Sequence, residues 1–406
     1  MAQPTPRLPL TVPIALSLFF TGVTYASTLN YAAIMGIDTL GIPNGLYSVV
    51  LTISSLAAAA ASVVLGYISD KIPDRRLIVI GTALMGALAF GLIFTLRSQF
   101  AFIVAACVLM PFGGALFSQS FSYARSYYNA REAANAEFMI TILRTIFSVA
   151  WVIVPPIVGW YAAVTTVFNA YLVAAIAYLV CAAIFVVLLG NPEAKIGVSK
   201  PADGETAAPV VKARIEPAIL GGIIGVTLIF TAVSLRTVTI PLLITTTLKG
   251  SYADLGIFAG LAAALELPFM VAWGYALRWL SKHTIIIIGA SLYAVYLVLI
   301  SRAGSVTDVL WLQLLNGPAT AALLTIPISY LQDAIKGRVG LSTSLLDVSH
   351  VVASLATAAL FGVLTATVQD YPRLMVVAAG LSACGAIALF VAHWLLEPKT
   401  ASATSR

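Results

Sequence analysis

Twelve long apolar segments constrain the fold of this chain more than any other feature of its sequence. Each has roughly the 20 residues that an α-helix needs to cross the hydrocarbon core of a bilayer. Unpaired backbone groups are costly in lipid, and the segments lack the alternating pattern of barrel strands, so helices are the remaining structure. The sequence therefore predicts an all-α polytopic membrane protein with twelve transmembrane helices. The predicted spans are 10–34, 43–69, 77–97, 99–127, 136–161, 164–190, 217–245, 251–280, 284–302, 307–331, 339–367 and 372–396.

The composition agrees with this class and argues against others. Hydrophobic residues make up 60% of the chain and charged residues 9%, whereas soluble domains carry about 25% charged residues. The net charge of +6 comes from basic residues scattered among short connectors, which argues against a nucleic-acid surface. Cys107, Cys181 and Cys384 lie in apolar stretches, so we expect neither a disulfide framework nor a metal cluster. No cofactor is expected.

The distribution of lysine and arginine predicts the orientation of the chain in the membrane. With the N-terminus inside, sixteen of the 22 basic residues fall on inner termini and connectors. Four fall on the outer side, namely Arg97, Lys249, Arg302 and Arg373. Since basic residues concentrate on the cytoplasmic side of a membrane protein, both termini are predicted to be cytoplasmic.

A motif near the front of the chain recurs in its second half. Residues 66–81 read GYISDKIPDRRLIVIG and residues 274–289 read GYALRWLSKHTIIIIG. The glycines at both ends, the first tyrosine and the Ile-rich restart are all displaced by 208 residues, which indicates an internal duplication. We therefore predict two pseudo-symmetric six-helix bundles, residues 1–190 and 217–406, joined by a cytoplasmic linker at 191–216.

The connector between the second and third predicted helices resembles the motif G-x-x-x-D-[RK]-x-G-R-R of the major facilitator superfamily. It matches at Gly66, Asp70, Lys71, Arg75 and Arg76, although Pro73-Asp74 stands where a single glycine is usual. Within that superfamily the chain is similar to bacterial sugar efflux transporters. The similar stretches are Tyr123-Ala124-Arg125, Leu143-Arg144, 150–156 (AWVIVPP), 265–268 (LELP), 312–316 (LQLLN), Gln332-Asp333 and Gly337-Arg338.

This resemblance implies the major facilitator fold and the export of sugars or sugar-like small polar molecules by proton antiport. It also implies a multi-pass protein of the bacterial cell inner membrane, with protons, a small polar substrate and the lipid bilayer as partners. The antiporter motif of the fifth helix, G-P-x-x-G-G, is retained only at Pro156 and Gly159. Efflux of drugs or other metabolites and uptake of sugars therefore stay open as alternatives.

We expect a monomer that binds no nucleic acid and is not an enzyme. The rival class outside transport is an integral membrane enzyme or receptor. The sequence contains no recognisable nucleophile triad, phosphate loop or metal-ligand spacing that would favour that class.

A cluster of charged residues is expected to form a gate at the cytoplasmic side. Asp70 and Arg125 lie at the inner ends of the second and fourth helices, and adding 208 residues gives Arg278 and Asp333. The same acid–base pair is thus predicted in each bundle with its signs exchanged, each pair contributing about 0 to 1 kcal/mol. The alternative is that the basic residues only mark the inner side. The predicted gate residues are Gly66, Asp70, Arg75, Arg76, Arg125, Arg278, Asp333 and Arg338.

Ionisable residues inside membrane spans are costly and usually face a cavity or a partner. Glu266 lies midway along the eighth helix and is the predicted proton carrier. Arg144 in the fifth helix is its predicted partner, either in a pair that depends on protonation or in a static structural ion pair. Asp347 and His350 lie one turn apart on a polar face of the eleventh helix. They are expected either to share a transported proton or to satisfy only each other.

A sugar site needs amide or guanidinium groups for paired hydroxyls, together with an aromatic plane for the ring. Helices 1, 4, 7 and 10 line the cavity in the superfamily that the chain resembles. Arg236 is expected to bond a substrate hydroxyl or to pair with Asp254, and the aromatic residues have packing as an alternative role. The predicted substrate-binding residues are Tyr25, Asn30, Gln119, Trp151, Arg236, Gln313 and Asn316.

Overall fold

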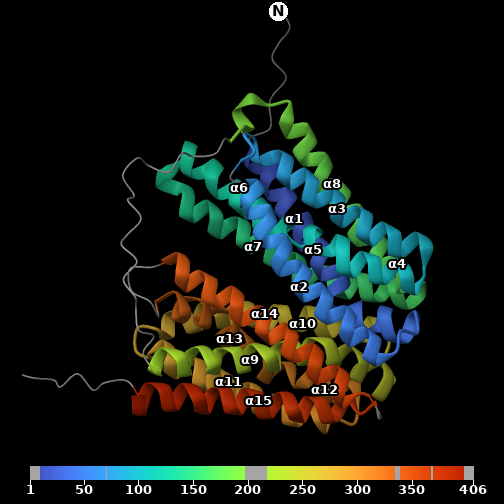
Figure 1. Ribbon diagram of the computed structural model, residues 1–406, viewed down its shortest axis with the longest axis vertical. Coiled ribbons are helices and arrows are strands. Elements are labelled where there is room, and N and C mark those ends of the chain that lie inside the picture. The colour runs from blue at the N-terminus through green and yellow to red at the C-terminus, as the bar shows by residue number, and fades with distance from the viewer. Residues whose placement is uncertain (1–9, 70, 197–216, 334–338, 367–368, 397–406) are drawn as a thin grey trace, which may run out of the picture. The chain divides into compact units, whose positions relative to one another are not determined.

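The computed structural model in Figure 1 describes residues 10–69, 71–196, 217–333, 339–366 and 369–396. Throughout these ranges the regular structure is helical, and twelve helices are long and apolar enough to cross a membrane. The prediction of an all-α protein with twelve spans is confirmed. The spans are Thr11–Tyr31, Asn44–Ser69, Arg75–Leu96, Gln99–Arg131, Ala133–Val164, Phe168–Leu189, Ile219–Thr247, Tyr252–Ala276, Lys282–Ser301, Gln313–Gln332, Leu345–Leu364 and Tyr371–Trp394.

Several spans consist of more than one helical element. The longer helices of the first half are α1 (Thr11–Thr28), α2 (Asn44–Ser69), α3 (Arg75–Leu96), α6 (Leu116–Arg131), α7 (Ala136–Val164) and α8 (Phe168–Leu189). Those of the second half are α9 (Pro217–Leu242), α10 (Tyr252–Ala276), α11 (Lys282–Ser301), α13 (Gln313–Asp333), α14 (Val339–Leu364) and α15 (Tyr371–Val391). The shorter elements are η1 (Leu29–Tyr31), η2 (Ile34–Thr39), α4 (Gln99–Val104), η3 (Ala105–Leu109), α5 (Met110–Gly113), η4 (Ala133–Asn135), η5 (Pro192–Ala194), η6 (Leu243–Thr247), α12 (Val306–Trp311) and η7 (Ala392–Leu396).

The chain divides into two units of dense internal packing. The first unit comprises Met1–Thr206 with Ile244–Ala263, and the second comprises Ala207–Leu243 with Ala264–Arg406. The first unit thus includes the beginning of α10, which the sequence assigned to the second bundle. The predicted boundaries at 190 and 217 remain a prediction, and most of the predicted linker lies outside the described residues.

Helix packing follows one pattern in both units. In the first unit α1 packs mainly against α7 and α8, and α3 packs against α8. In the second unit α9 packs mainly against α14 and α15, and α11 packs against α15 and α13. The second pattern is the first one moved six spans along the chain, which is what an internal duplication produces.

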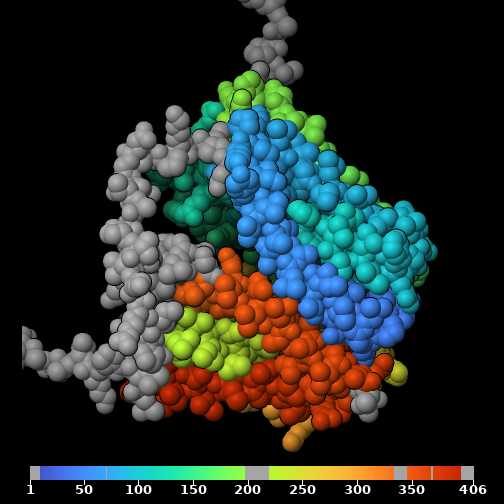
Figure 2. All heavy atoms as spheres, viewed as in Figure 1, coloured from blue at the N-terminus to red at the C-terminus, as the bar shows by residue number. Residues whose placement is uncertain are grey.

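The apolar side chains that the fold leaves exposed are those expected of helices in lipid. Figure 2 shows α2 (blue) on the surface of its unit, and its exposed side chains include Val49, Ile53, Leu56 and Val63. The buried core of α1 to α8 is formed by alanine, isoleucine, valine, leucine and aromatic side chains, with Tyr31, Tyr123, Tyr128 and Tyr171 among those that are fully buried.

Two predicted spans are broken where the sequence was interpreted as one helix. The fourth span changes from α4 to the π-helical η3, continues as α5, and turns at Gly114-Ala115 before α6 begins. Pro111 has no amide hydrogen to donate, and Gly113 and Gly114 favour irregular backbone, so this segment cannot propagate a regular helix. The tenth predicted span is likewise divided at Leu312 into α12 and α13.

Glycines allow a close crossing of α7 and α10 within the first unit. A Cβ added at Gly256 would lie 2.3 Å from the carbonyl oxygen of Pro155 and 3.0 Å from the Cα of Gly159. A Cβ at Gly260 would lie 2.6 Å from the ring of Pro156. Small residues at such a crossing let two helix backbones approach without side chains between them.

Candidate functional site

Polar side chains from four helices of the second unit form one continuous cluster, which we name the α13 network. α9, α10 and α11 each contribute one residue, and α13 contributes three residues from successive turns. Membrane helices place few polar groups inside, so the spacing of these three on one face of α13 is informative. The members of the α13 network are Arg236, Glu266, Tyr296, Gln313, Asn316 and Thr320.

One end of the network is the carboxyl group of Glu266. Thr320 Oγ1 lies 2.8 Å from Glu266 Oε1 and also 2.8 Å from the carbonyl oxygen of Asn316. A threonine hydroxyl has a single proton, so it can donate to only one of these two acceptors at a time. When Glu266 is ionised the hydroxyl can donate to the carboxylate. When Glu266 is protonated, the carboxyl can donate to Thr320, which then donates to Asn316.

The other end of the network is the guanidinium of Arg236. Arg236 Nη2 donates to the Tyr296 hydroxyl at 3.3 Å, and Arg236 Cζ lies 5.9 Å from the centre of the Tyr296 ring. Gln313 Nε2 also donates to the Tyr296 hydroxyl, at 3.4 Å, and Asn316 Nδ2 donates to Gln313 Oε1 at 3.0 Å. A guanidinium and a carboxyl group therefore stand at the two ends of a chain of neutral hydrogen-bonding groups.

One hydrogen-bond acceptor inside the network, on Asn316, is unpaired among the described residues. Gln313 and Asn316 are fully buried. Asn316 Oδ1 is buried without a hydrogen-bond partner among the described residues. A buried acceptor left in this state is unfavourable, which suits a group that binds water or a ligand at another stage.

The predicted partners of Arg236 and Glu266 do not pair with them. Asp254 accepts hydrogen bonds from the amide and hydroxyl of Ser251, both at 2.8 Å, and so caps the start of α10. Arg144 is exposed and forms no ion pair within the part of the chain that the structure describes. Arg144 therefore does not neutralise Glu266 in the described structure, and Glu266 is partnered by a neutral hydroxyl.

Asp347 and His350 are both exposed on α14 and do not approach within ion-pair distance in the described structure. The imidazole of His350 stacks on the ring of Phe230, with centroids 4.2 Å apart and planes 8° apart. No ion pair joins the two side chains among the described residues, and the shared proton stays a prediction. Aromatic stacking, rather than a carboxylate, holds the histidine.

At the predicted gate the first residue of α3, Arg75, contacts two serines of α6. Arg75 Nη1 donates to the hydroxyls of Ser122 at 2.8 Å and Ser126 at 3.0 Å. Arg125, which was expected to pair with Asp70, forms an exposed ion pair of 2.8 Å with Glu137. Gly66 and Arg278 are exposed, and Arg278 lies over the ring of Tyr275. Asp70, Arg338 and the side chain of Asp333 lie outside the described residues.

The Pro73-Asp74 departure from the family motif has a structural role that sequence reasoning missed. Asp74 is the N-cap of α3 and accepts from the Arg76 amide at 3.1 Å. Its carboxylate also receives Arg76 Nε at 2.9 Å and Nη2 at 2.7 Å, while Arg76 Nη1 donates to the carbonyl oxygens of Leu188 and Asn191. These bonds from the Arg76 guanidinium hold the pKa of Asp74 below its usual value. The acidic residue directly before a helix, two residues from an arginine, was the available signal.

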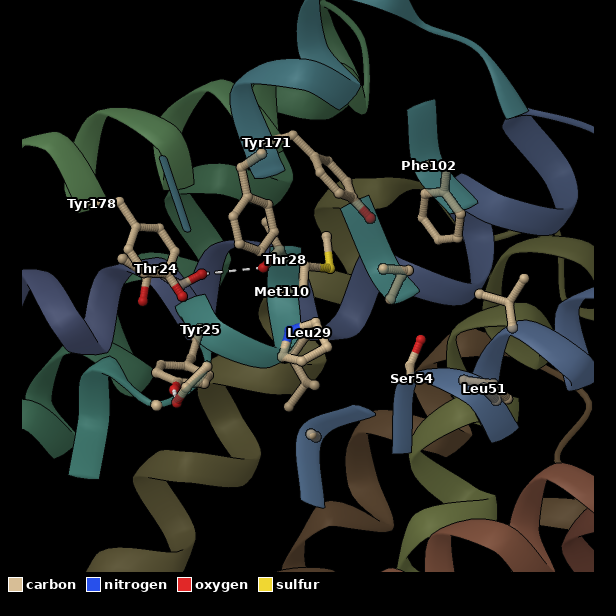
Figure 3. Close-up of a pocket in the computed structure, with 18 of the residues that line it drawn as sticks. Thr24, Tyr25, Thr28, Leu29, Leu51, Ser54, Phe102, Met110, Tyr171 and Tyr178 are labelled. Carbon is tan, nitrogen blue, oxygen red and sulfur yellow. Dashed lines mark hydrogen bonds between the residues drawn. The ribbon is translucent and has the colours of Figure 1, made fainter. Parts of the chain in front are cut away.

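The first unit contains a partly open cavity of about 480 Å³ between α1, α2, α3, α8 and the broken fourth span (Figure 3). Among its lining residues are five with hydroxyl groups close to the break, namely Thr24, Tyr25, Thr28, Ser118 and Tyr178. The volume lies within the range of about 300 to 1,000 Å³ that is typical of small-molecule sites.

Tyrosine hydroxyls hold the backbone of the broken span at this cavity. Tyr25 donates to the carbonyl oxygen of Gly114, and Tyr178 donates to that of Gly113 at 3.3 Å. These carbonyls lack partners within a regular helix because the span turns there. The sequence signal was the run Met110-Pro111-Phe112-Gly113-Gly114, since a proline and two glycines interrupt an apolar segment.

The predicted substrate residues fall into three groups. Tyr25 lines the cavity of the first unit. Arg236, Gln313 and Asn316 lie in the α13 network of the second unit. Asn30, Gln119 and Trp151 are half-buried and belong to neither group in the described structure.

Twelve membrane-spanning helices in two units, a carboxyl inside a span and a cavity beside a broken helix together define a membrane transporter. The family model described as "Major Facilitator Superfamily" matches residues 14–312. The chain belongs to this superfamily, so it is a transporter and not an enzyme.

Similar proteins of known name are sugar efflux transporters. The chain is 29% identical over 327 residues to sugar efflux transporter B of Salmonella typhimurium, covering 80% of this chain and 81% of that protein. It is 26% identical over 373 residues to sugar efflux transporter A of Dickeya chrysanthemi, covering 92% and 93%.

Solved structures with the same fold include the nucleoside transporter NupG. The TM-score is 0.74 at 13% identity, and the alignment covers 95% of this chain and 99% of that one. A peptide transporter of the POT family, in complex with alafosfalin, gives a TM-score of 0.76 at 11% identity over 94% of both chains.

Proposed function

We propose that this protein is a proton-coupled exporter of sugars or related small polar molecules that works by alternating access. The names of its relatives support a sugar as substrate and export as direction. Glu266 is the observation that carries the proton coupling. It is a carboxyl group within an otherwise apolar span, hydrogen-bonded to a neutral hydroxyl rather than neutralised by an ion pair.

The α13 network allows a change in the charge of Glu266 to alter hydrogen bonds as far away as Arg236. Loss of the proton makes Glu266 an obligatory acceptor, so Thr320 turns its proton toward it and releases the carbonyl of Asn316. Asn316 and Gln313 are adjacent members of the chain of bonds that leads to Arg236. In this proposal, protonation reorganises the amides and biases the protein between states that open to opposite sides.

The remaining predicted proton residues, Arg144, Asp347 and His350, are assigned no step in this scheme because none of them contacts Glu266 in the described structure. We further propose a monomer in the bacterial inner membrane with both termini in the cytoplasm, which the excess of basic residues on the inner connectors supports. The predicted gate residues on that side would then open and close the cytoplasmic entrance.

The proton role is tested with purified protein in liposomes under an imposed pH gradient and with labelled neutral sugars as substrate. Glu266→Gln retains the shape and one acceptor oxygen but cannot ionise, so we expect pH-driven transport to fall at least tenfold. Exchange of internal for external sugar without a gradient should persist in this variant. Glu193→Gln is the matched control, because Glu193 is an exposed glutamate outside the network.

Thr320 has a companion test as the residue that positions Glu266. Thr320→Val should shift the pH dependence of transport while Thr320→Ser restores it. Undiminished pH-driven transport by Glu266→Gln would rule out the carrier role, whereas loss of gradient-free exchange as well would indicate a damaged fold.

Export of drugs or other amphipathic compounds is a second candidate, favoured by one observation. The cavity of the first unit includes Phe90, Phe102 and Met110 in its wall, and neither Gln119 nor Asn316 lines it. Competition by uncharged amphipathic compounds against sugar transport distinguishes the two functions, since a sugar exporter should be inhibited only by compounds that carry several hydroxyl groups.

A further inference from the structure

We propose that the cavity of the first unit is a binding site for an uncharged, hydroxylated small molecule, and that it selects the substrate while the α13 network handles the proton. The proposal rests on the proposed function in taking this ligand to be the transported one. It assigns recognition to α1, α2, α8 and the broken fourth span. The amides of α13, which the sequence favoured for substrate, are instead part of the coupling machinery.

The residues that line the cavity carry no charge. None of the 21 residues that line the cavity is an aspartate, glutamate, lysine, arginine or histidine. An ion that entered would lose its hydration without gaining a counter-charge, and that loss is far more costly than the burial of a neutral hydroxyl. The cavity therefore favours neutral ligands over their ionised counterparts.

Several hydroxyl groups at the cavity already donate their protons to the backbone. Five lining hydroxyls already donate to backbone carbonyls: Tyr25 to Gly114, Tyr178 to Gly113, Thr24 to Thr21, Thr28 to Thr24 and Ser118 to Ala115. Each has its single proton committed, so what it offers to a ligand is a lone pair. Toward these five hydroxyls a complementary ligand acts as a hydrogen-bond donor while remaining neutral. Hydroxyl groups on a ring or a chain meet both requirements.

Packed aromatic rings form part of the cavity wall. Phe90 packs against Tyr178 with ring centroids 5.5 Å apart and against Tyr171 with centroids 5.7 Å apart, and all three line the cavity. Figure 3 shows Tyr171 and Tyr178 on one side of the cavity and Phe102, Leu51 and Ser54 on the other. Planar apolar surface beside acceptor oxygens matches a ring that has C–H faces and hydroxyl edges.

The break in the fourth span lies at the cavity. Irregular backbone at membrane depth is tolerated only where it is covered by protein or lines a cavity. Here the π-helical η3 and the turn at Gly114 lie at the cavity, which includes Ala106, Met110, Pro111 and Gly114 in its wall. Such interruptions concentrate at functional sites, and in transporters they mark the place where substrate binds.

The experiment measures equilibrium binding to purified protein in lipid nanodiscs, with no gradient and no glycosidic detergent. The probes are glucose, galactose, maltose and mannitol, with gluconate and glucosamine as charged analogues. We expect at least one neutral probe to bind and the charged analogue of glucose to bind at least tenfold more weakly than glucose wherever glucose binds. Failure of every neutral probe, or equal binding of charged analogues, overturns the proposal.

Two variants of α2 locate the site. Ala58 is exposed at the cavity wall, and Ala60 is exposed on the same helix but does not line the cavity. Ala58→Phe should reduce affinity for the bound probe at least tenfold, and Ala60→Phe should leave it unchanged. Ser118→Ala, which removes one acceptor without filling the space, should weaken binding by a smaller factor. Equal affinity in Ala58→Phe and Ala60→Phe would place the ligand elsewhere.

The binding site and the proton coupling fail separately in this design. Glu266→Gln should still bind the neutral probe, because no residue of the α13 network lines the cavity. If Glu266→Gln loses binding, then recognition is not confined to the first unit and this inference is wrong. If Glu266→Gln retains pH-driven transport while Ala58→Phe loses binding, the proposed coupling is wrong and the site stands.

Discussion

Asp74 has two roles at the start of α3, because it caps the helix and also neutralises the buried guanidinium of Arg76. The side chain of Arg76 is 4% exposed and that of Asp74 is 13% exposed. Loss of one partner leaves a buried charge uncompensated, which typically costs about 3 to 5 kcal/mol. The exposed pair between Arg125 and Glu137 belongs to the opposite class, where each pair contributes about 0 to 1 kcal/mol.

Asp74→Asn should lower the apparent Tm of the detergent-solubilised protein at pH 7 by several degrees, whereas Glu137→Gln should change it by less than one. Asparagine is also a good N-cap, so the loss reports the ion pair rather than the cap. Because the pKa of Asp74 is lowered in the folded protein, the stabilisation is complete above its unfolded pKa of about 3.9. It disappears as the pH falls through the folded pKa.

The difference in Tm between wild type and Asp74→Asn should therefore stay constant from pH 7 down to about 5, and it should shrink only in stronger acid. Differential scanning fluorimetry across that range measures it. A difference that already declines between pH 7 and pH 6 would show that another group, and not Asp74, determines the effect.

Individual residues show where sequence reasoning succeeds and where it stops. Glu266 could be selected from the sequence because an ionisable side chain within an apolar span is costly and rare. Its partner could not, since Thr320 is a neutral residue on another helix and only tertiary packing brings it within 2.8 Å. Arg144 is predicted as the partner by its charge and its position in the fifth helix, but it is exposed and forms no ion pair among the described residues.

At the level of elements, the number and type of the helices follow from hydrophobic length alone, and the breaks within them do not. The fourth span was interpreted as one helix because its apolar run is continuous. Whether a proline and two glycines kink a helix or interrupt it depends on what satisfies the freed carbonyls. Here Tyr25 and Tyr178, from α1 and α8, satisfy them.

The crossing of α7 and α10 offers a test at this level. In Gly256→Ala the added Cβ would lie 2.3 Å from the Pro155 carbonyl, a distance that forces the two helices apart. We expect a clear loss of thermal stability. Gly274→Ala on the same helix meets nothing within 4 Å, and alanine is the better helix former by roughly 1 kcal/mol.

Gly274→Ala should therefore be neutral or slightly stabilising in the same thermal unfolding assay. If both alanine variants unfold at the wild-type temperature, the two helices do not cross as closely as described. If both are equally destabilised, the effect arises from the loss of glycine and not from the crossing.

The whole molecule repeats one packing plan in two units that differ in chemistry. The duplication is legible in the sequence because glycines and apolar runs recur after 208 residues. The difference between the two copies cannot be recognised in this way, because it depends on which interior positions carry polar groups. The first unit contains a cavity that is lined by uncharged residues and hydroxyl acceptors, and the second contains Arg236 and Glu266 at the ends of a hydrogen-bonded chain.

An uncharged cavity has an electrical consequence. If the cargo is neutral and its export is coupled to a proton as proposed, the only charge that crosses the membrane in a turnover is that of the proton, and the cycle is then electrogenic. A potential of 100 mV then contributes about 2.3 kcal/mol per elementary charge, with the pH equal on both sides. A potassium diffusion potential, negative inside and imposed with valinomycin, should accelerate sugar release from loaded liposomes. Release that does not depend on the membrane potential would mean that the cargo or a second ion balances the charge of the proton. The uncharged lining around Tyr25 and Tyr178 would thus allow this protein to draw on the membrane potential as well as on the pH gradient.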